Sequence, residues 1–227
     1  MRNMTKRRRA LMISSDQSRL PEEFQEVAWL QGTGSQYFSL NQGGIGLTSD
    51  NHFYGIKGNI EELNATRYSL LTINAYSGRP SQAQYKEWNV KGAYGDLEAG
   101  YYPYNSTDIK LKVEDELSYH FEINRNSVVI NNSVLNNPQF PSGSYCDGIY
   151  IGARLTSNET LIVENSNVKI KSIKLTYDDS VIYELIPCYR KADSKAGLFY
   201  WIDYSQGTSG FITNSGSGSD FLVGPDA

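Results

Sequence analysis

The chain has 227 residues, a formal net charge of −4 and only two cysteines. That length can bury a complete core, as one large β domain or as one or two ordinary domains. The weakly acidic balance argues against a general nucleic-acid binder, because such a protein carries a basic face or stripe. No apolar run is long enough for a membrane-spanning helix, so the sequence predicts no membrane span.

The N-terminal residues combine a basic cluster with a short apolar stretch. Lys6–Arg9 resembles the start of a signal peptide, but Ala10–Ile13 is much shorter than the ~7–15 apolar residues that a signal peptide needs. We therefore expect a protein made in the cytoplasm without a secretion signal. The sequence predicts a flexible basic tail over residues 1–19 and a single globular domain over residues 20–227.

From Leu20 onward the sequence predicts strands, with little helix. A proline followed by two acidic residues is typical of a first helical turn, so we expect at most one turn of helix over Pro21–Gln25. Farther along, apolar and lysine residues alternate in Ile109–Val113, which predicts a half-buried strand.

A hairpin and a bulged strand follow. Leu117–Ile123 and Val128–Ile130 alternate on either side of an Asn-Arg-Asn break, and asparagine tolerates the left-handed conformation of a tight turn. Gly148–Gly152 is typical of a short central strand. The apolar positions change parity within Val168–Tyr177, so one continuous strand there needs a β-bulge near Lys171–Ser172.

The overall pattern predicts an all-β fold made of two antiparallel sheets. Short strands, frequent turn residues, 20 glycines and aromatic-rich segments favour a jelly-roll β-sandwich. The Ser/Gly/Thr-rich stretch Gly207–Gly218 is interrupted by Phe211 and Ile212, so we expect a loop with a short strand inside it.

Both ends of the chain resemble one group of proteins. Leu20–Phe38 is similar to the opening LPxEYQEVEYIESTGTQYI, although Ala28–Leu30 replaces the usual acidic-aromatic-aliphatic run. The close IPCxRKSD…GTGxFxxGP is similar to these positions: Ile186–Asp193, Gly197–Phe199, Gly216, Gly218, Phe221 and Val223–Pro225. Ile149–Arg154 and Val168–Leu175 also resemble a passage of concanavalin A-like, laminin-G-like sandwiches.

The resemblance is to prophage-associated proteins with a concanavalin A-like jelly roll. It implies a phage tail-region, baseplate or host-surface protein, located in a phage particle or at a surface, and it brings no catalytic residues. We therefore expect a non-enzymatic recognition or structural module. Its partners would be a glycan or cell-surface ligand, phage structural proteins, or further copies of itself. We also expect Val27–Tyr37 and Val168–Leu185 to pair, since jelly rolls commonly pair their terminal strands.

An aromatic segment supplies the candidate ligand-binding residues, which are Trp88, Tyr101, Tyr102 and Tyr104. Flat rings stack on the apolar faces of sugars, although the same rings can simply pack two sheets together. Pro103 cannot donate to a sheet ladder, which favours an edge strand or a loop around these tyrosines.

No catalytic signature is present. Glucanases with this fold carry Glu-x-Asp-x-Glu, which places three acids on one sheet face, whereas Glu114–Glu116 is contiguous and is typical of a solvated turn. Neither His52 nor His120 has a cysteine or serine at a sequence spacing typical of a catalytic pair. A glycoside-acting enzyme of the glucanase class and a purely architectural particle protein are the alternative functions.

A metal site has slightly more support than a catalytic site, and a phosphate site has little. Calcium suits carboxylates at a loop rim, and the candidates are Asp50, Asp96, Asp147, Asp178 and Asp179. They form no dense cluster, so we expect exposed loop acids and no cofactor. Gly43–Gly46 is glycine-rich like a phosphate-binding P-loop, but it lacks the Lys-Ser/Thr of that motif. We therefore interpret it as a turn. Cys146 and Cys188 are interpreted as small buried residues, with their pairing left open.

Overall fold

The computed structural model describes residues 19–40 and 180–227 continuously, and between them the strands whose bounds are given below. The regular structure of these residues is strand, apart from the three-residue 3-10 turn η1 (Tyr204–Gln206). The prediction of an all-β fold is therefore confirmed. No helix in the described part of the chain is long and apolar enough to span a membrane.

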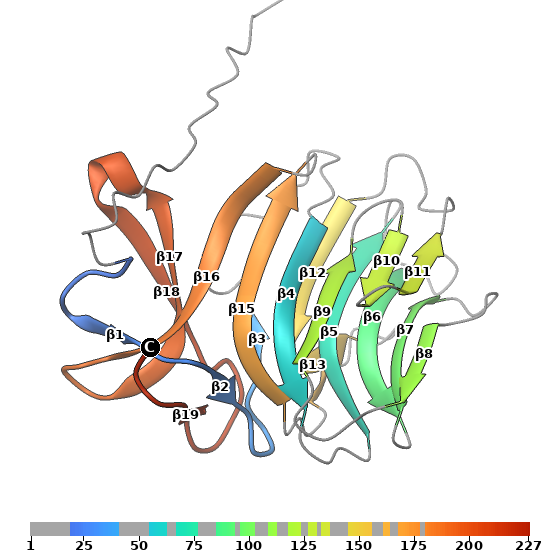
Figure 1. Cartoon of the computed structure of the whole chain (residues 1–227), viewed down its shortest axis with the longest axis horizontal. Helices are drawn as coiled ribbons and strands as arrows, with labels where there is room; N and C mark the ends of the chain where they lie inside the picture. Colours follow the sequence, from blue (N-terminus) through green and yellow to red (C-terminus); the bar gives the residue numbers. More distant parts are fainter. Residues whose placement is uncertain are drawn as a thin grey trace, which may run out of the picture.

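The larger sheet has 11 antiparallel strands (Figure 1). Its main path is β11-β10-β9-β4-β15-β16-β17-β18, and three short strands from the chain ends attach beside β15 and β16. In chain order the path consists of β4 (Gly55–Glu62), β9 (Ser118–Ile123), β10 (Ser127–Ile130), β11 (Ser133–Asn136), β15 (Val168–Tyr177), β16 (Ser180–Arg190), β17 (Lys195–Asp203) and β18 (Thr208–Thr213).

The second sheet has 6 antiparallel strands in the order β3-β12-β5-β6-β7-β8. They are β3 (Phe38–Ser39), β5 (Arg67–Tyr76), β6 (Tyr85–Ala93), β7 (Asp96–Tyr102), β8 (Ile109–Lys112) and β12 (Tyr145–Ile151); β13 (Ala153–Leu155) and β14 (Leu161–Val163) form a separate pair. The sheets approach each other where β7 meets β10, β8 meets β11 and β3 meets β18. Two antiparallel sheets were predicted, and the jelly-roll connectivity stays a prediction.

Several strands agree with the sequence pattern. β9 and β10 form the predicted hairpin, with Ile123 opposite Val128. β15 is one continuous strand, and its register against β4 shifts between Ile170 and Ser172, which confirms the predicted bulge. The extra residue is needed because Ile170 and Ile173 are both buried although their spacing has the wrong parity for a regular strand.

The described N-terminal segment contains no helix, which agrees with the expectation of at most one helical turn over Pro21–Gln25. The amide of Phe24 donates to the carbonyl oxygen of Pro21 at 3.0 Å, which closes a single turn. β1 (Phe24–Glu26) then begins and pairs with β16. Pairing with an existing strand and packing of the Phe24 ring in the core outweigh the weak helical preference of this short sequence.

The two chain ends form one element, which we call the terminal clasp and define as Phe24–Gln31 together with Leu222–Ala227. It contains β1, β2 (Leu30–Gln31) and β19 (Leu222–Val223). Leu30 pairs with Ile170 of β15 on one side and with Val223 on the other. The prediction that the N-terminal segment pairs with the Val168–Leu185 region is thus confirmed.

The terminal clasp fills the space where β15 and β16 separate. β1 pairs with the second half of β16, and β2 pairs with the first half of β15 (Figure 1). Hydrogen bonds then tie the C-terminus to this segment: Ala28 N donates to Pro225 O at 2.9 Å, and Ala227 N donates to Glu26 O at 3.1 Å. Figure 1 shows the C-terminus beside β1.

Residues from the opening and closing sequence motifs contact one another. Phe221 stacks on Phe38, with ring centroids 4.2 Å apart and an interplanar angle of 6°. A Cβ atom at Gly224 would lie 2.7 Å from the Trp29 ring, so only glycine fits under that ring without a shift. These motif residues therefore hold the fold together.

Arg19 belongs to the folded part of the protein, although the sequence analysis placed it at the end of the tail. Its guanidinium is 2.9 Å from Glu26 and 2.7 Å from Glu184. Its carbonyl oxygen accepts from the indole nitrogen of Trp201 at 2.9 Å. The folded chain thus begins at Arg19 or before it.

Candidate functional site

The structure places three of the predicted ligand-binding residues in neighbouring strands of the second sheet. Trp88 of β6 is directly opposite Tyr101 of β7, and Tyr102 is opposite Glu87. β8 flanks β7 as far as Ala99, so that part of β7 is not an edge. Tyr104 lies outside the described residues.

Two of the candidate calcium ligands are strand residues and not loop residues, which corrects the sequence analysis. Asp96 is the first residue of β7, and Asp147 is the extra residue where the register of β12 against β5 shifts. Asp50, Asp178 and Asp179 lie outside the described residues. Within the described part of the chain, no group of three histidine, cysteine, aspartate or glutamate side chains could hold a metal ion.

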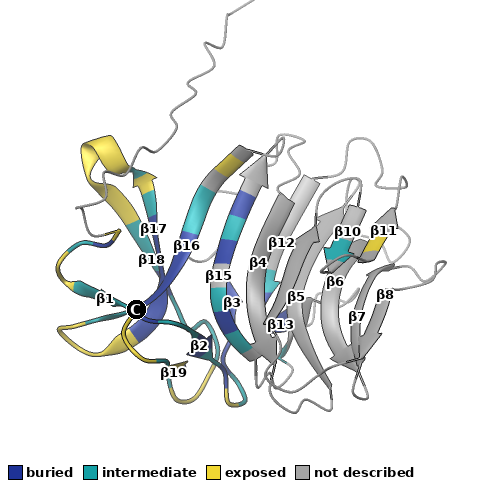
Figure 2. Cartoon of the chain, viewed as in Figure 1, coloured by how far each residue is buried: buried dark blue, intermediate teal, exposed yellow. Residues whose placement is uncertain are grey.

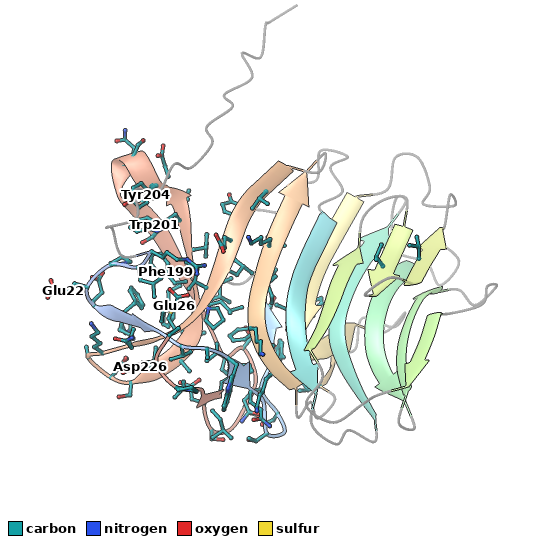
Figure 3. All side chains as sticks on the ribbon, viewed as in Figure 1. Glu22, Glu26, Phe199, Trp201, Tyr204 and Asp226 are labelled. Carbon is teal, nitrogen blue, oxygen red and sulfur yellow. The ribbon has the colours of Figure 1, made fainter. Side chains whose placement is uncertain are left out.

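Five aromatic rings pack in a row that runs from the core to the surface, and we call this row the aromatic column. Phe24 lies 4.9 Å from Phe211 and 5.0 Å from Phe199, measured between ring centroids. Phe199 is then 5.1 Å from Trp201, and Trp201 is 4.9 Å from Tyr204, both edge to face. Figure 3 shows Phe199, Trp201 and Tyr204 following one another toward the end of the β17–β18 hairpin.

The column follows from strand periodicity and register. Phe199 and Trp201 are two residues apart in β17 and therefore lie on the same face. Phe211 of β18 is directly opposite Phe199 and joins that face. Leu20, Ile186 and Cys188 are buried around Phe199 and form the core beneath it. Buried residues of β15, β16 and β17 are dark blue in Figure 2.

The outer end of the column is exposed to solvent. Tyr204 is 38% exposed, and the neighbouring Ile202 is 50% exposed because it is the extra residue of a bulge against β18. Asp203 caps the η1 turn by accepting from the amide of Ser205 at 2.9 Å, and Gly207 ends it with φ 65°. The turn is thus fixed by local hydrogen bonds, so the exposed ring has a defined position.

The opposite end of the column is covered by a charged pair. The guanidinium of Arg190 lies 5.8 Å from the centroid of the Phe211 ring. Arg190 also donates to Asp193 from Nε at 3.0 Å and from Nη2 at 2.5 Å. These hydrogen bonds lower the pKa of Asp193 to about 2. The charged pair thus lies beside the Phe211 ring, whereas the Tyr204 ring at the other end of the column is 38% exposed.

Cys188 lies beneath the column as a free and fully buried thiol. Burial is the main cause that raises its pKa from 9.0 to about 12, and the charge of Glu26 contributes a smaller part of this rise. The thiol is therefore protonated at neutral pH and a poor nucleophile. Cys188 has no disulfide partner, which agrees with its interpretation as a small buried residue.

We expect Cys188 to resist iodoacetamide at pH 8 in the folded protein and to react readily in urea. Because folding raises the thiol pKa, its contribution to stability is present below pH 9 and is lost as the pH rises toward 12. Mass-spectrometric mapping of the alkylated peptides measures the rate at this cysteine. Equal rates in the folded and unfolded states would contradict the buried environment.

Sequence reasoning missed the aromatic column. Phe199 and Trp201 show the alternation of a strand, which was available as a signal. Phe24, however, comes from the opposite end of the chain, and no local sequence pattern connects it to β17.

The chain matches no protein-family model and no curated protein. Among solved structures it is similar to Scytalido-glutamic peptidase in complex with a peptide-based transition-state analogue. The identity is 12%, the match covers 68% of this chain and 84% of that chain, and the TM-score is 0.37. It is also similar to SCP-B, a member of the Eqolisin family of peptidases, at 10% identity, the same coverages and a TM-score of 0.33. Such values assign no activity, and they give no support to the prediction that the chain is not an enzyme.

Proposed function

We propose that this chain is a non-enzymatic recognition module and that the tip of the β17–β18 hairpin contacts its ligand. The observation that carries the proposal is the exposed Tyr204 ring, which packs edge-on against Trp201 at the end of the aromatic column. A ring held in place before binding loses little conformational entropy when a ligand stacks on it.

The chemistry of the tip suits a carbohydrate. The C–H faces of a sugar ring stack on aromatic side chains, and polar groups beside the ring bind its hydroxyls. Ser205 and Gln206 are exposed next to Tyr204. The Ser205 hydroxyl donates to Asp203 at 2.6 Å, which orients its oxygen. This set resembles a shallow sugar-binding surface.

The biological setting that we propose is a prophage-encoded tail-region or surface-associated protein. The support is the resemblance of both chain ends to such proteins, together with an exposed apolar tip suited to a surface ligand. A purely architectural role would use the same fold and leave the tip without a ligand.

A glycan array tests the proposal with three variants of the full chain. We expect Tyr204→Ala to lower binding about fivefold, because stacking on one ring contributes on the order of 1 kcal/mol. Tyr204→Phe keeps the ring and should retain most of the binding. Val181→Ala removes an apolar side chain that is 49% exposed on β16 and serves as the control.

Two outcomes would point to a different ligand site or to a different function. Loss of binding in a Tyr102→Ala/Tyr104→Ala variant, with binding retained in Tyr204→Ala, would place the ligand at the aromatic segment that includes the end of β7. Release of reducing ends from a bound glycan would favour the glycoside-acting enzyme instead. Binding of no glycan by the wild-type protein would contradict the carbohydrate proposal.

A further inference from the structure

We infer that a second copy of this chain pairs with strand β18, so that two large sheets join edge to edge. β18 stands at the end of the strand order and pairs with β17 alone among the described strands. An edge strand presents a row of N–H and C=O groups that another strand can satisfy. This inference is independent of the ligand proposed for the hairpin tip.

β18 lacks the features that usually protect an edge. Its sequence, Thr-Ser-Gly-Phe-Ile-Thr, contains no charged residue and no proline. By contrast, the edge strand β8 of the second sheet carries Lys110 and Lys112. Lysine on an edge discourages pairing with another sheet. β11 (Ser133–Asn136), at the other end of the large sheet, also lacks charge and proline but has only 4 residues against the 6 of β18.

β18 has a regular register against β17 over most of its length, and its first residues are exposed. Thr208 and Ser209 are exposed, whereas Ile212 is buried toward the other end of the strand. The bulge of this hairpin places its extra residue, Ile202, in β17. From Ser209 to Thr213 the register against β17 is unbroken. A partner strand thus has access to Thr208–Gly210.

A second copy fits this edge because a two-fold interface uses the same patch on both partners. In antiparallel self-pairing centred on the exposed first residues of β18, Ser209 faces Ser209 of the partner subunit and Thr208 faces the partner's Gly210. These residues are small and uncharged, so self-pairing brings no like charges together. The net charge of −4 resides elsewhere in the sequence.

Sedimentation velocity of the full chain measures this association over a range from low micromolar to near-millimolar concentration. We expect the average mass to rise from 25.5 kDa toward that of a dimer. Ser209→Lys places two like charges directly opposite each other and should weaken the dimer at least about tenfold. Ala192→Lys adds the same charge at an exposed turn and should dimerise like the wild type.

Charge exchange makes the test specific for this edge. Ser209→Glu alone should also fail to dimerise, and an equimolar mixture of Ser209→Lys and Ser209→Glu should recover association, because opposite charges then face each other. If the wild-type chain stays at 25.5 kDa over the whole concentration range, the inference is overturned. The remaining candidate partner for β18 would then be a strand of another protein. A dimer that Ser209→Lys does not weaken, or a mixture that stays monomeric, would also overturn the inference.

Discussion

Deletion of residues 1–38 is expected to give an insoluble chain, whereas deletion of residues 1–18 should leave the thermal midpoint nearly unchanged. The longer deletion removes Val27, Leu30 and Phe38, which are at most 2% exposed. It also removes the strands that pair with β15, β16 and β12. Exposed strand edges and an open core favour aggregation.

Soluble yield after expression and the thermal midpoint by circular dichroism measure the two deletions. A third chain, lacking residues 1–19, isolates Arg19, whose ion pairs with Glu26 and Glu184 are partly exposed and hence of modest strength. We expect only a small fall in its midpoint. A soluble 39–227 chain that unfolds cooperatively would show that the terminal clasp is dispensable for folding.

The substitution Phe199→Ala is expected to destabilise the protein by ~3–5 kcal/mol, as is usual when a buried phenylalanine becomes alanine. Phe199 is 1% exposed and contacts the rings of Phe24 and Trp201. Its removal leaves a cavity between the N-terminal segment and the β17–β18 hairpin. The terminal clasp depends on that packing through β1.

Urea unfolding followed by tryptophan fluorescence gives the change in free energy. Tyr204→Ala is the matched control, because it removes a ring from the exposed end of the same column and should cost much less. Equal losses in the free energy of unfolding for the two variants would contradict the description of the column as having one buried part and one exposed end.

The strand assignments could be derived from the sequence because they depend on local alternation. The hairpin of β9 and β10 follows from an alternating pattern on both sides of a turn. The bulge in β15 follows from parity, since Ile170 and Ile173 must both face the core. The strand within Gly207–Gly218 was expected for the same reason and is now β18.

The candidate site could be predicted only in part. β17 shows the alternation that places Phe199 and Trp201 on one face, but nothing local connects this strand to Phe24. The carbonyl of Arg19 that holds Trp201 is likewise 182 residues away in the chain. Such contacts depend on which strands lie next to each other, and the sequence pattern does not specify that.

The sequence by itself therefore determined the all-β class, the half-buried strands and the bulge, because side-chain alternation within a few residues decides them. Only the tertiary structure decided that Pro21–Phe24 closes a single turn before β1, that Arg19 belongs to the fold and that the chain ends form one clasp. The physical reason is that these features depend on pairing with β15 and β16, whose free energy exceeds the weak local preferences of the terminal residues.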